Sequence, residues 1–162
     1  MRFVKPHPLI ALDVDGVLLP FGPCSGEPIY ALQGSGVVTP EAQEAVKVLL
    51  SLNVEMRWFT TWGARAANST FGELLGMRKP LKGVPSTSSE MSMSSAVDQK
   101  AEAASEFLKF RPWRELIILD DQVTSMHHRM HVIQVDSHTG LQMAHVDEVT
   151  KVLKRLRDSS LR

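Results

Sequence analysis

Short apolar runs alternate along the chain with segments whose apolar residues recur every three or four positions. Residues 9–14 and 115–120 are mainly apolar runs, a pattern that predicts buried strands. Residues 54–60 alternate less cleanly but end in Trp58 and Phe59, which favours another buried strand. Residues 131–135 predict a further strand, and residues 81–85 predict a short one. Uninterrupted apolar strands are typical of a parallel sheet that is covered on both faces.

Other segments have the pattern of helices. Thr39 predicts an N-cap and Pro40 a first helical position, and Asn53 predicts a left-handed end to the same helix. Ser95 and Asp98 resemble the capping box of a later helix. The predicted helices cover residues 40–52, 64–75, 96–110 and 126–130 and a C-terminal stretch that contains Val146, Val149, Val152, Leu153 and Leu156.

Two segments are rich in residues that interrupt regular structure. Residues 20–38 hold glycines at 22, 26, 34 and 36 and prolines at 20, 23 and 28, which predicts a loop or an irregular hairpin. Residues 77–95 are similarly rich in proline, glycine and serine. The alternation of strands and helices around them predicts a single α/β domain over residues 1–162, a three-layer sandwich with a mainly parallel sheet.

The composition excludes several classes of function. Lysine plus arginine number 18, as do aspartate plus glutamate, and this zero net charge argues against a strongly basic nucleic-acid binder. The single cysteine, Cys24, excludes an internal disulfide framework and a cysteine-rich zinc site. Because no long apolar run predicts a signal peptide or a membrane span, we expect a cytoplasmic protein with no membrane partner.

Acidic and hydroxyl side chains follow the predicted strands at their carboxyl ends. These residues are Asp13, Asp15, Thr60, Thr61, Asp120 and Asp121. Sites in open parallel sheets form at this edge, so we expect the four carboxylates to converge there. They would repel one another unless a cation lay among them, and oxygen ligands favour Mg²⁺.

The turn after the first strand fits such a site. Asp13 and Asp15 share one side of the strand, while Val14 packs on the other. Gly16 allows a sharp turn and a close approach of the backbone to a ligand. An isolated Asp-x-Asp-Gly is often a solvated turn, but its place after an apolar strand favours a functional site.

Three of these segments resemble motifs of the haloacid dehalogenase-like (HAD) phosphohydrolases. Residues 13–18, Asp-Val-Asp-Gly-Val-Leu, resemble the first motif. Residues 59–62, Phe-Thr-Thr-Trp, resemble the second, and residues 119–121, Leu-Asp-Asp, resemble the fourth. The order and spacing fit from Leu9 to about Asp136.

Further segments resemble one subgroup, the small HAD domain of bacterial Swiss Army Knife RNA-repair proteins. These segments are Trp58-Phe59-Thr60-Thr61-Trp62, Ala67-Asn68, Leu75-Gly76, Asp120-Asp121 and Gly140-Leu141. The resemblance implies a Rossmann-like HAD sheet and a Mg²⁺-dependent phosphatase that works through an aspartyl-phosphate. The spans from Gly16 to Thr60 and from Trp62 to Lys100 are too loop-like for a folded cap domain, and residues 20–38 are expected to act as a loop or flap.

The resemblance also implies roles for individual residues. Asp13 would be the nucleophile, and Asp15 would act as general acid and then as general base. Mg²⁺ would be bound by Asp13, the backbone carbonyl of Asp15, and Asp120 or Asp121. Phosphate contacts are expected from Gly16, Thr60, Thr61 and Lys100.

The phosphate-binding lysine is the site residue with the least local sequence support. Lys100 is preferred to Lys79 and Lys82 because it shares a helical face with apolar Ala104 and Phe107, which should turn toward the sheet. No proline-flanked motif surrounds Lys100, and Gln122 stands where related sequences often keep another acid, which suggests weaker metal binding.

Several alternatives stay open at this stage. A capless site favours a phosphate on a large molecule, such as an RNA or DNA end, whereas a small-molecule (nucleotide) phosphatase and a non-catalytic HAD-fold binding domain are the other candidates. His127 and His131 have the spacing of a helical metal pair, and Trp62 could stack on a base. The chain has no phosphate-binding or dinucleotide-binding glycine loop of the usual form. The oligomeric state is left open.

Overall fold

The apolar runs form a parallel sheet of five strands within residues 7–84 and 96–161, the part of the chain that the computed structural model describes. The strand order is β5-β4-β1-β6-β7, and every pairing in this sheet is parallel. The strands are β1 (His7–Leu12), β4 (Glu55–Trp58), β5 (Lys82–Gly83), β6 (Arg114–Asp120) and β7 (Met130–Gln134). The expected α/β sandwich with a mainly parallel sheet is therefore confirmed.

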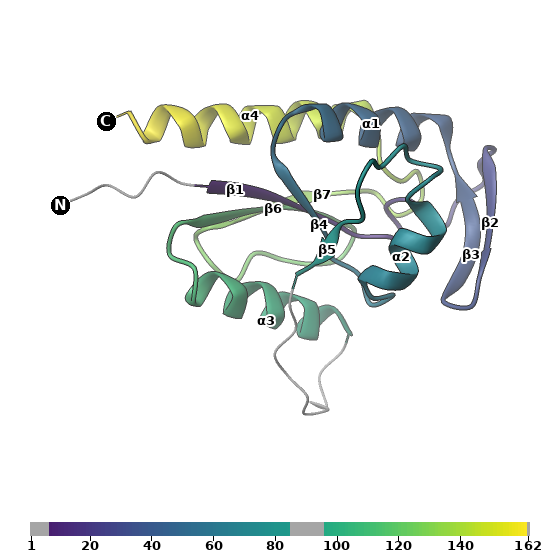
Figure 1. Ribbon diagram of the computed structural model, residues 1–162, viewed down its shortest axis with the longest axis horizontal. Coiled ribbons are helices and arrows are strands. Elements are labelled where there is room, and N and C mark those ends of the chain that lie inside the picture. Colours follow the sequence, from purple (N-terminus) through teal and green to yellow (C-terminus); the bar gives the residue numbers. More distant parts are fainter. Residues whose placement is uncertain (1–6, 85–95, 162) are drawn as a thin grey trace.

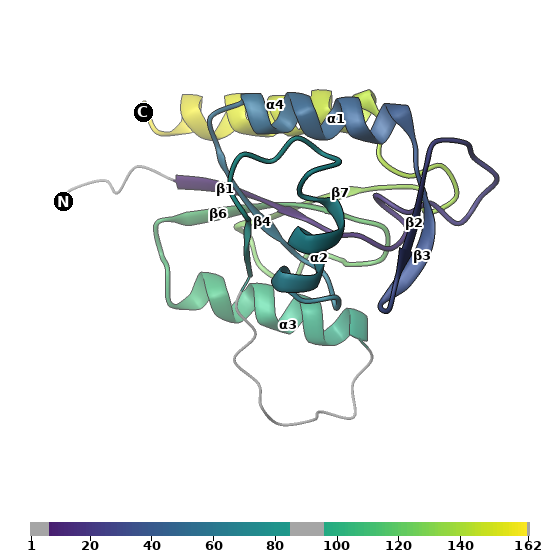
Figure 2. The same ribbon diagram turned by 45° about the vertical axis from the view of Figure 1, so that its right-hand side comes forward.

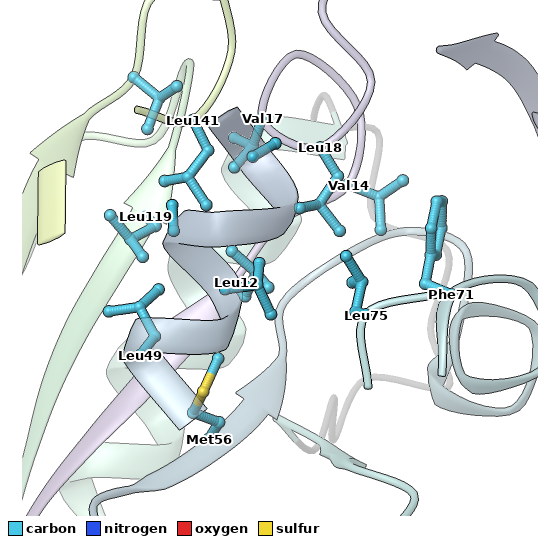
Figure 3. Packing of buried hydrophobic residues seen from close by; sticks show 14 of the residues in the cluster. Leu12, Val14, Val17, Leu18, Leu49, Met56, Phe71, Leu75, Leu119 and Leu141 are labelled. Atoms are coloured by element: carbon cyan, nitrogen blue, oxygen red, sulfur yellow. The ribbon is translucent and has the colours of Figure 1, made fainter. Parts of the chain in front are cut away.

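Helices cover both faces of this sheet, which makes three layers (Figure 1). Helices α1 (Pro40–Ser51) and α4 (Met143–Ser159) lie on one face, and α3 (Ala96–Lys109) lies on the other. Alternate residues of β1 point to opposite faces: Leu12 joins the α1 side of the core, whereas Leu9 and Ala11 join the α3 side. Figure 3 shows Leu12 in one cluster with Leu49 of α1 and Leu119 of β6.

The start and end of α1 are as predicted. The hydroxyl of Thr39 accepts a hydrogen bond from the Ala42 amide at 3.1 Å, and Pro40 occupies the first turn. Asn53 has a φ of 53°, the left-handed conformation expected where the chain leaves the helix. The predicted capping box at Ser95 and Asp98 lies outside the residues described in this detail.

Residues 20–38 form a more regular structure than predicted. β2 (Glu27–Ala31) and β3 (Gly34–Val38) pair as an antiparallel hairpin, which stands at the right-hand end of the molecule in Figure 2. Helix α2 (Ala64–Phe71) follows β4. The glycines are explained by close packing: a Cβ at Gly34 would lie 3.0 Å from Cζ2 of Trp62, and one at Gly36 would lie 3.4 Å from Leu19.

Two helix predictions need correction. Helix α2 ends at Phe71 rather than at residue 75, because the chain continues in turns to Gly76, whose φ is 69°. The predicted helix at 126–130 is absent, and Met130 instead begins β7. The Arg129 guanidinium holds this turn through carbonyl oxygens of Leu108, Arg111 and Arg114. These tertiary contacts outweigh a single isolated helical turn, which is costly to nucleate.

The described part of the chain contains no folded cap domain; the hairpin β2–β3 is the only sheet structure outside the central sheet. Among these same residues, no helix combines the length and apolar character needed to cross a membrane.

Candidate active site

Two buried aspartates meet where β1 and β6 end side by side. Leu12 and Leu119 are paired at the ends of these strands, and the backbone amide of Asp13 donates to the Leu119 carbonyl at 3.1 Å. The next residue of each strand therefore carries its carboxylate to the same edge of the sheet. Asp13 is 5% exposed and Asp120 only 1% exposed, so both carboxylates are held largely out of solvent.

Lys100 of α3 lies between these two carboxylates. Its Nζ is 3.0 Å from Oδ1 of Asp13 and 2.5 Å from Oδ2 of Asp120. The ammonium also lies 4.7 Å from the ring centroid of Phe59, in a cation–π contact. The alternative lysines, Lys79 and Lys82, are exposed and do not line this pocket.

Asp120, the last residue of β6, and the next residue, Asp121, have different surroundings. Oδ1 of Asp120 accepts hydrogen bonds from the amides of Gln122 and Val123 at 2.8 and 2.9 Å, while Oδ2 pairs with Lys100. Both oxygens of Asp120 are thus engaged. Asp121 is half-buried, and its carboxylate lies close enough to Asp13 and Asp120 for oxygens of all three to fall within 4.8 Å of one another.

Gly16 makes the position of Asp121 possible. Its φ is 75°, in the left-handed region that favours glycine. A Cβ at this position would lie 2.4 Å from Oδ2 of Asp121, well inside contact distance. The turn after β1 therefore requires glycine both for its backbone conformation and for the carboxylate beside it.

The electrostatics of this cluster favour a bound cation. Burial raises the pKa of the Asp13 carboxyl to about 8; Lys100 lowers it, and the charge of Asp120 raises it. Burial and then the neighbouring Asp120 charge also raise the pKa of Asp121. A single ammonium does not balance three carboxylates, and carboxylate oxygens are the ligands that Mg²⁺ prefers. The residues present therefore fit a magnesium ion.

Asp15 is held by a residue that follows β4. The indole Nε1 of Trp62 donates to Oδ2 of Asp15 at 3.0 Å. Trp62 is 7% exposed and packs against Phe71, with 5.4 Å between ring centroids. It is therefore a buried positioning group for a carboxylate, and its ring is not available as the stacking platform that was left open from the sequence.

The two threonines after β4 occupy different places. Thr61 lines the pocket that contains the aspartates, whereas Thr60 lines an adjoining cavity and its hydroxyl accepts a hydrogen bond from the Trp62 amide at 3.2 Å. The aspartate pocket has a volume of about 180 Å³. Its lining residues are Asp13, Asp15, Phe21, Thr61, Lys100, Asp120, Asp121 and Gln122.

Two members of this lining were not predicted as site residues. Phe21 belongs to the segment whose glycines and prolines predicted only a loop, and Gln122 was noted only as a missing acid. No local pattern marks either of them. The histidine pair does not form a metal site in the described residues: His131 pairs with Glu115, and Nδ1 of His127 accepts from the Arg129 amide.

Comparison with known proteins gives one family. A family model described as the HAD domain in Swiss Army Knife RNA repair proteins matches residues 9–146. No curated protein and no solved structure matches the chain. The matched range includes both strands that carry the aspartates, the segment that follows β4, and Lys100.

Proposed function

The chain belongs to the family of HAD domains found in Swiss Army Knife RNA repair proteins, and from this premise we propose that it is a Mg²⁺-dependent phosphatase. It hydrolyses a phosphomonoester through an aspartyl-phosphate. The observation that carries the proposal is the buried carboxylate of Asp13, which lies between Lys100 and Asp121 with Asp15 in the same pocket. A solvated turn would not bury an aspartate among other carboxylates.

In the first step, Oδ2 of Asp13 attacks the phosphorus atom. We assign the attack to Oδ2 because Oδ1 accepts a hydrogen bond from the Val14 amide at 2.8 Å and pairs with Lys100 at 3.0 Å. The phosphorus–oxygen bond of the ester breaks, and Asp15 gives its proton to the departing oxygen. Lys100 offsets the negative charge that gathers as carboxylate and phosphoryl group meet.

In the second step, water attacks the phosphorus of the aspartyl-phosphate. Asp15, now ionised, takes a proton from that water, and the bond between phosphorus and Oδ2 of Asp13 breaks. Inorganic phosphate leaves, and both aspartates return to their starting protonation states. Splitting the reaction in this way replaces one difficult displacement by two easier ones.

Asp13, the backbone carbonyl of Asp15 and Asp121 would hold the magnesium ion. When bound, it supplies positive charge that offsets the repulsion between phosphate and carboxylates. Asp120 is the weaker candidate ligand, since its oxygens already accept two amide hydrogen bonds and pair with Lys100.

The substrate is proposed to carry its phosphate on a large molecule, such as an RNA or DNA end, since the described residues form no cap domain over the site. A small-molecule (nucleotide) phosphatase is the competing reading, because the hairpin β2–β3 approaches the site: a Cβ at Gly34 would lie 3.8 Å from Oδ1 of Asp15. The presence of both Asp13 and Asp15 argues against a binding domain without catalysis.

The test is hydrolysis of p-nitrophenyl phosphate by the wild type and by Asp13→Asn, with Mg²⁺ and with a chelator. We expect turnover that requires Mg²⁺ and is abolished in Asp13→Asn, which removes the nucleophile with little change in volume. Wild-type turnover by Asp13→Asn would exclude the covalent mechanism. A screen of phosphorylated metabolites against phosphate-ended oligonucleotides separates the two substrate classes.

A further inference from the structure

A second cavity adjoins the aspartate pocket. It lies where the ends of β4 and β5 approach the first turns of α2 and α3, and its volume is about 350 Å³. Its lining residues are Trp58, Phe59, Thr60, Thr61, Gly63, Ala64, Gly83, Val84, Gln99, Lys100 and Ala103. Thr61 and Lys100 line both spaces, so the cavity opens beside the atoms that would hold the phosphoryl group.

The lining of this cavity combines apolar and uncharged polar residues. Trp58, Phe59 and Val84 are among its apolar members, Thr60, Thr61 and Gln99 are polar, and the lining that the structure describes contains no carboxylate. Lys100 is its one cation, and that ammonium is already paired with two aspartates of the neighbouring pocket. A charged group would therefore lose its hydration without gaining a free partner of opposite charge.

Small residues account for the empty space. Gly63, Ala64, Gly83 and Ala103 contribute little or no side chain to its walls. A Cβ at Gly63 would meet nothing within 4 Å, and one at Gly83 would meet only Cβ of Ala64, at 3.6 Å. Larger side chains at these positions would fill the cavity, so its size depends on these particular residues.

We infer that this cavity binds an uncharged aromatic ring in the leaving group of the substrate. The inference rests on the proposed phosphatase function. At about 180 Å³, the aspartate pocket falls below the roughly 300–1,000 Å³ of ordinary ligand sites, whereas the adjoining cavity falls within that range. The first holds the reacting phosphoryl group, and the second holds the ring attached to the alcohol.

The other described cavities do not serve this role. They are lined mainly by residues of α4, such as Leu153, Lys154 and Arg155, and contain none of the residues of the aspartate pocket. The cavity beside Lys100, in contrast, shares Thr61 and Lys100 with the aspartate pocket, so a substrate could occupy it while its phosphate lies at Asp13.

The test compares benzyl phosphate with ethyl phosphate, two esters of primary alcohols that differ in the ring. We expect kcat/KM for benzyl phosphate to be about tenfold higher or more, as expected for burial of an aromatic ring. The variant Ala103→Leu should reduce this preference about tenfold by filling the cavity. Glu102→Leu places the same side chain one position earlier on exposed helix surface and should keep the preference.

A binding measurement separates this inference from the proposed function. Benzylphosphonate and ethylphosphonate have a carbon in place of the ester oxygen and cannot be hydrolysed there. Calorimetry with these two compounds therefore measures binding in the cavity without turnover. Preference for benzylphosphonate, lost in Ala103→Leu or in Gly83→Val, supports the ring site even where no phosphatase activity is found. Equal binding of the two phosphonates, or a preference that both variants retain, would overturn it.

Discussion

The indole of Trp62 and the carboxylate of Asp15 form a hydrogen bond, with 3.0 Å between Nε1 and Oδ2. The two residues follow different strands, β1 and β4, and are separated by 47 positions in the chain. Trp62 is fixed from both sides, by the ring of Phe71 and by the close approach of the hairpin at Gly34. The orientation of the proposed acid and base is therefore set by a buried indole.

Replacing Trp62 by phenylalanine should weaken acid–base catalysis while keeping an aromatic ring in the core. A hydrogen bond to a charged group contributes about 1.5–3 kcal/mol, so we expect kcat to fall about 10–100-fold for alkyl phosphates. The loss in kcat/KM, which reports the first step, should be smaller for p-nitrophenyl phosphate, whose leaving group needs little protonation. Trp113→Phe, at a half-exposed tryptophan outside the pocket, is the matched control. Unchanged kcat and kcat/KM for alkyl phosphates would contradict a role through Asp15.

Replacing Asp15 by asparagine should separate the two chemical steps. A good leaving group departs without protonation, but hydrolysis of the aspartyl-phosphate still needs an activated water. We expect a burst of nitrophenol followed by turnover slowed about 10²–10⁴-fold or more. Mass spectrometry should find one phosphoryl group on the peptide that contains Asp13. Steady-state turnover like that of the wild type would show that Asp15 is neither acid nor base.

The neighbouring aspartates should respond differently to alanine. Asp121→Ala should raise the Mg²⁺ concentration needed for half-maximal activity, because it removes a carboxylate from the proposed metal site. Asp120→Ala should instead lower the free energy of unfolding by about 1–3 kcal/mol, because it removes the acceptor of two backbone amides, that of Gln122 and the buried one of Val123. Mg²⁺ titration and urea denaturation of both variants measure the two effects, and reversed outcomes would exchange the assigned roles.

Gly16→Ala should weaken Mg²⁺ binding at the proposed metal site, in addition to the loss of stability that backbone strain causes. The change costs about 1–2 kcal/mol for a left-handed residue, and its Cβ also forces Asp121 away. Gly76→Ala is the control, because Gly76 has a similar φ of 69° and a Cβ there meets nothing within 4 Å. Both variants should lose comparable stability in thermal unfolding. A weakened response to Mg²⁺ is expected only for Gly16→Ala.

The local sequence pattern was sufficient to predict the parallel sheet and the edge of the sheet at which the aspartates meet. Residues 9–12 and 116–119 are apolar without interruption, and only a strand buried on both faces accommodates such a run. Parallel strands then bring Asp13 and Asp120 together without further information, since both follow the ends of paired strands. The α/β fold and the proposed acidic centre both follow from these short-range features.

The local sequence pattern did not predict the correct conformation where residues distant in the sequence determine it. The glycines at 34 and 36 predicted an irregular segment, yet they lie in a regular hairpin that packs closely on Trp62 and Leu19. The predicted helix at 126–130 is replaced by a turn, because Arg129 binds carbonyl groups at the far end of α3. In both places the determining contact is remote in sequence.

The chain by itself determined which residue types reach the edge of the sheet, because the period of two and the direction of each strand are local properties. Only the tertiary structure decided which of these residues contact one another and which role each can therefore have. In the folded chain Lys100 pairs with Asp13, and Asp120 accepts hydrogen bonds from backbone amides. Asp121 lies close to the other two aspartates, and Trp62 donates a hydrogen bond to Asp15. These choices depend on distances between side chains from separate elements, and such distances exist only after the helices have packed on the sheet.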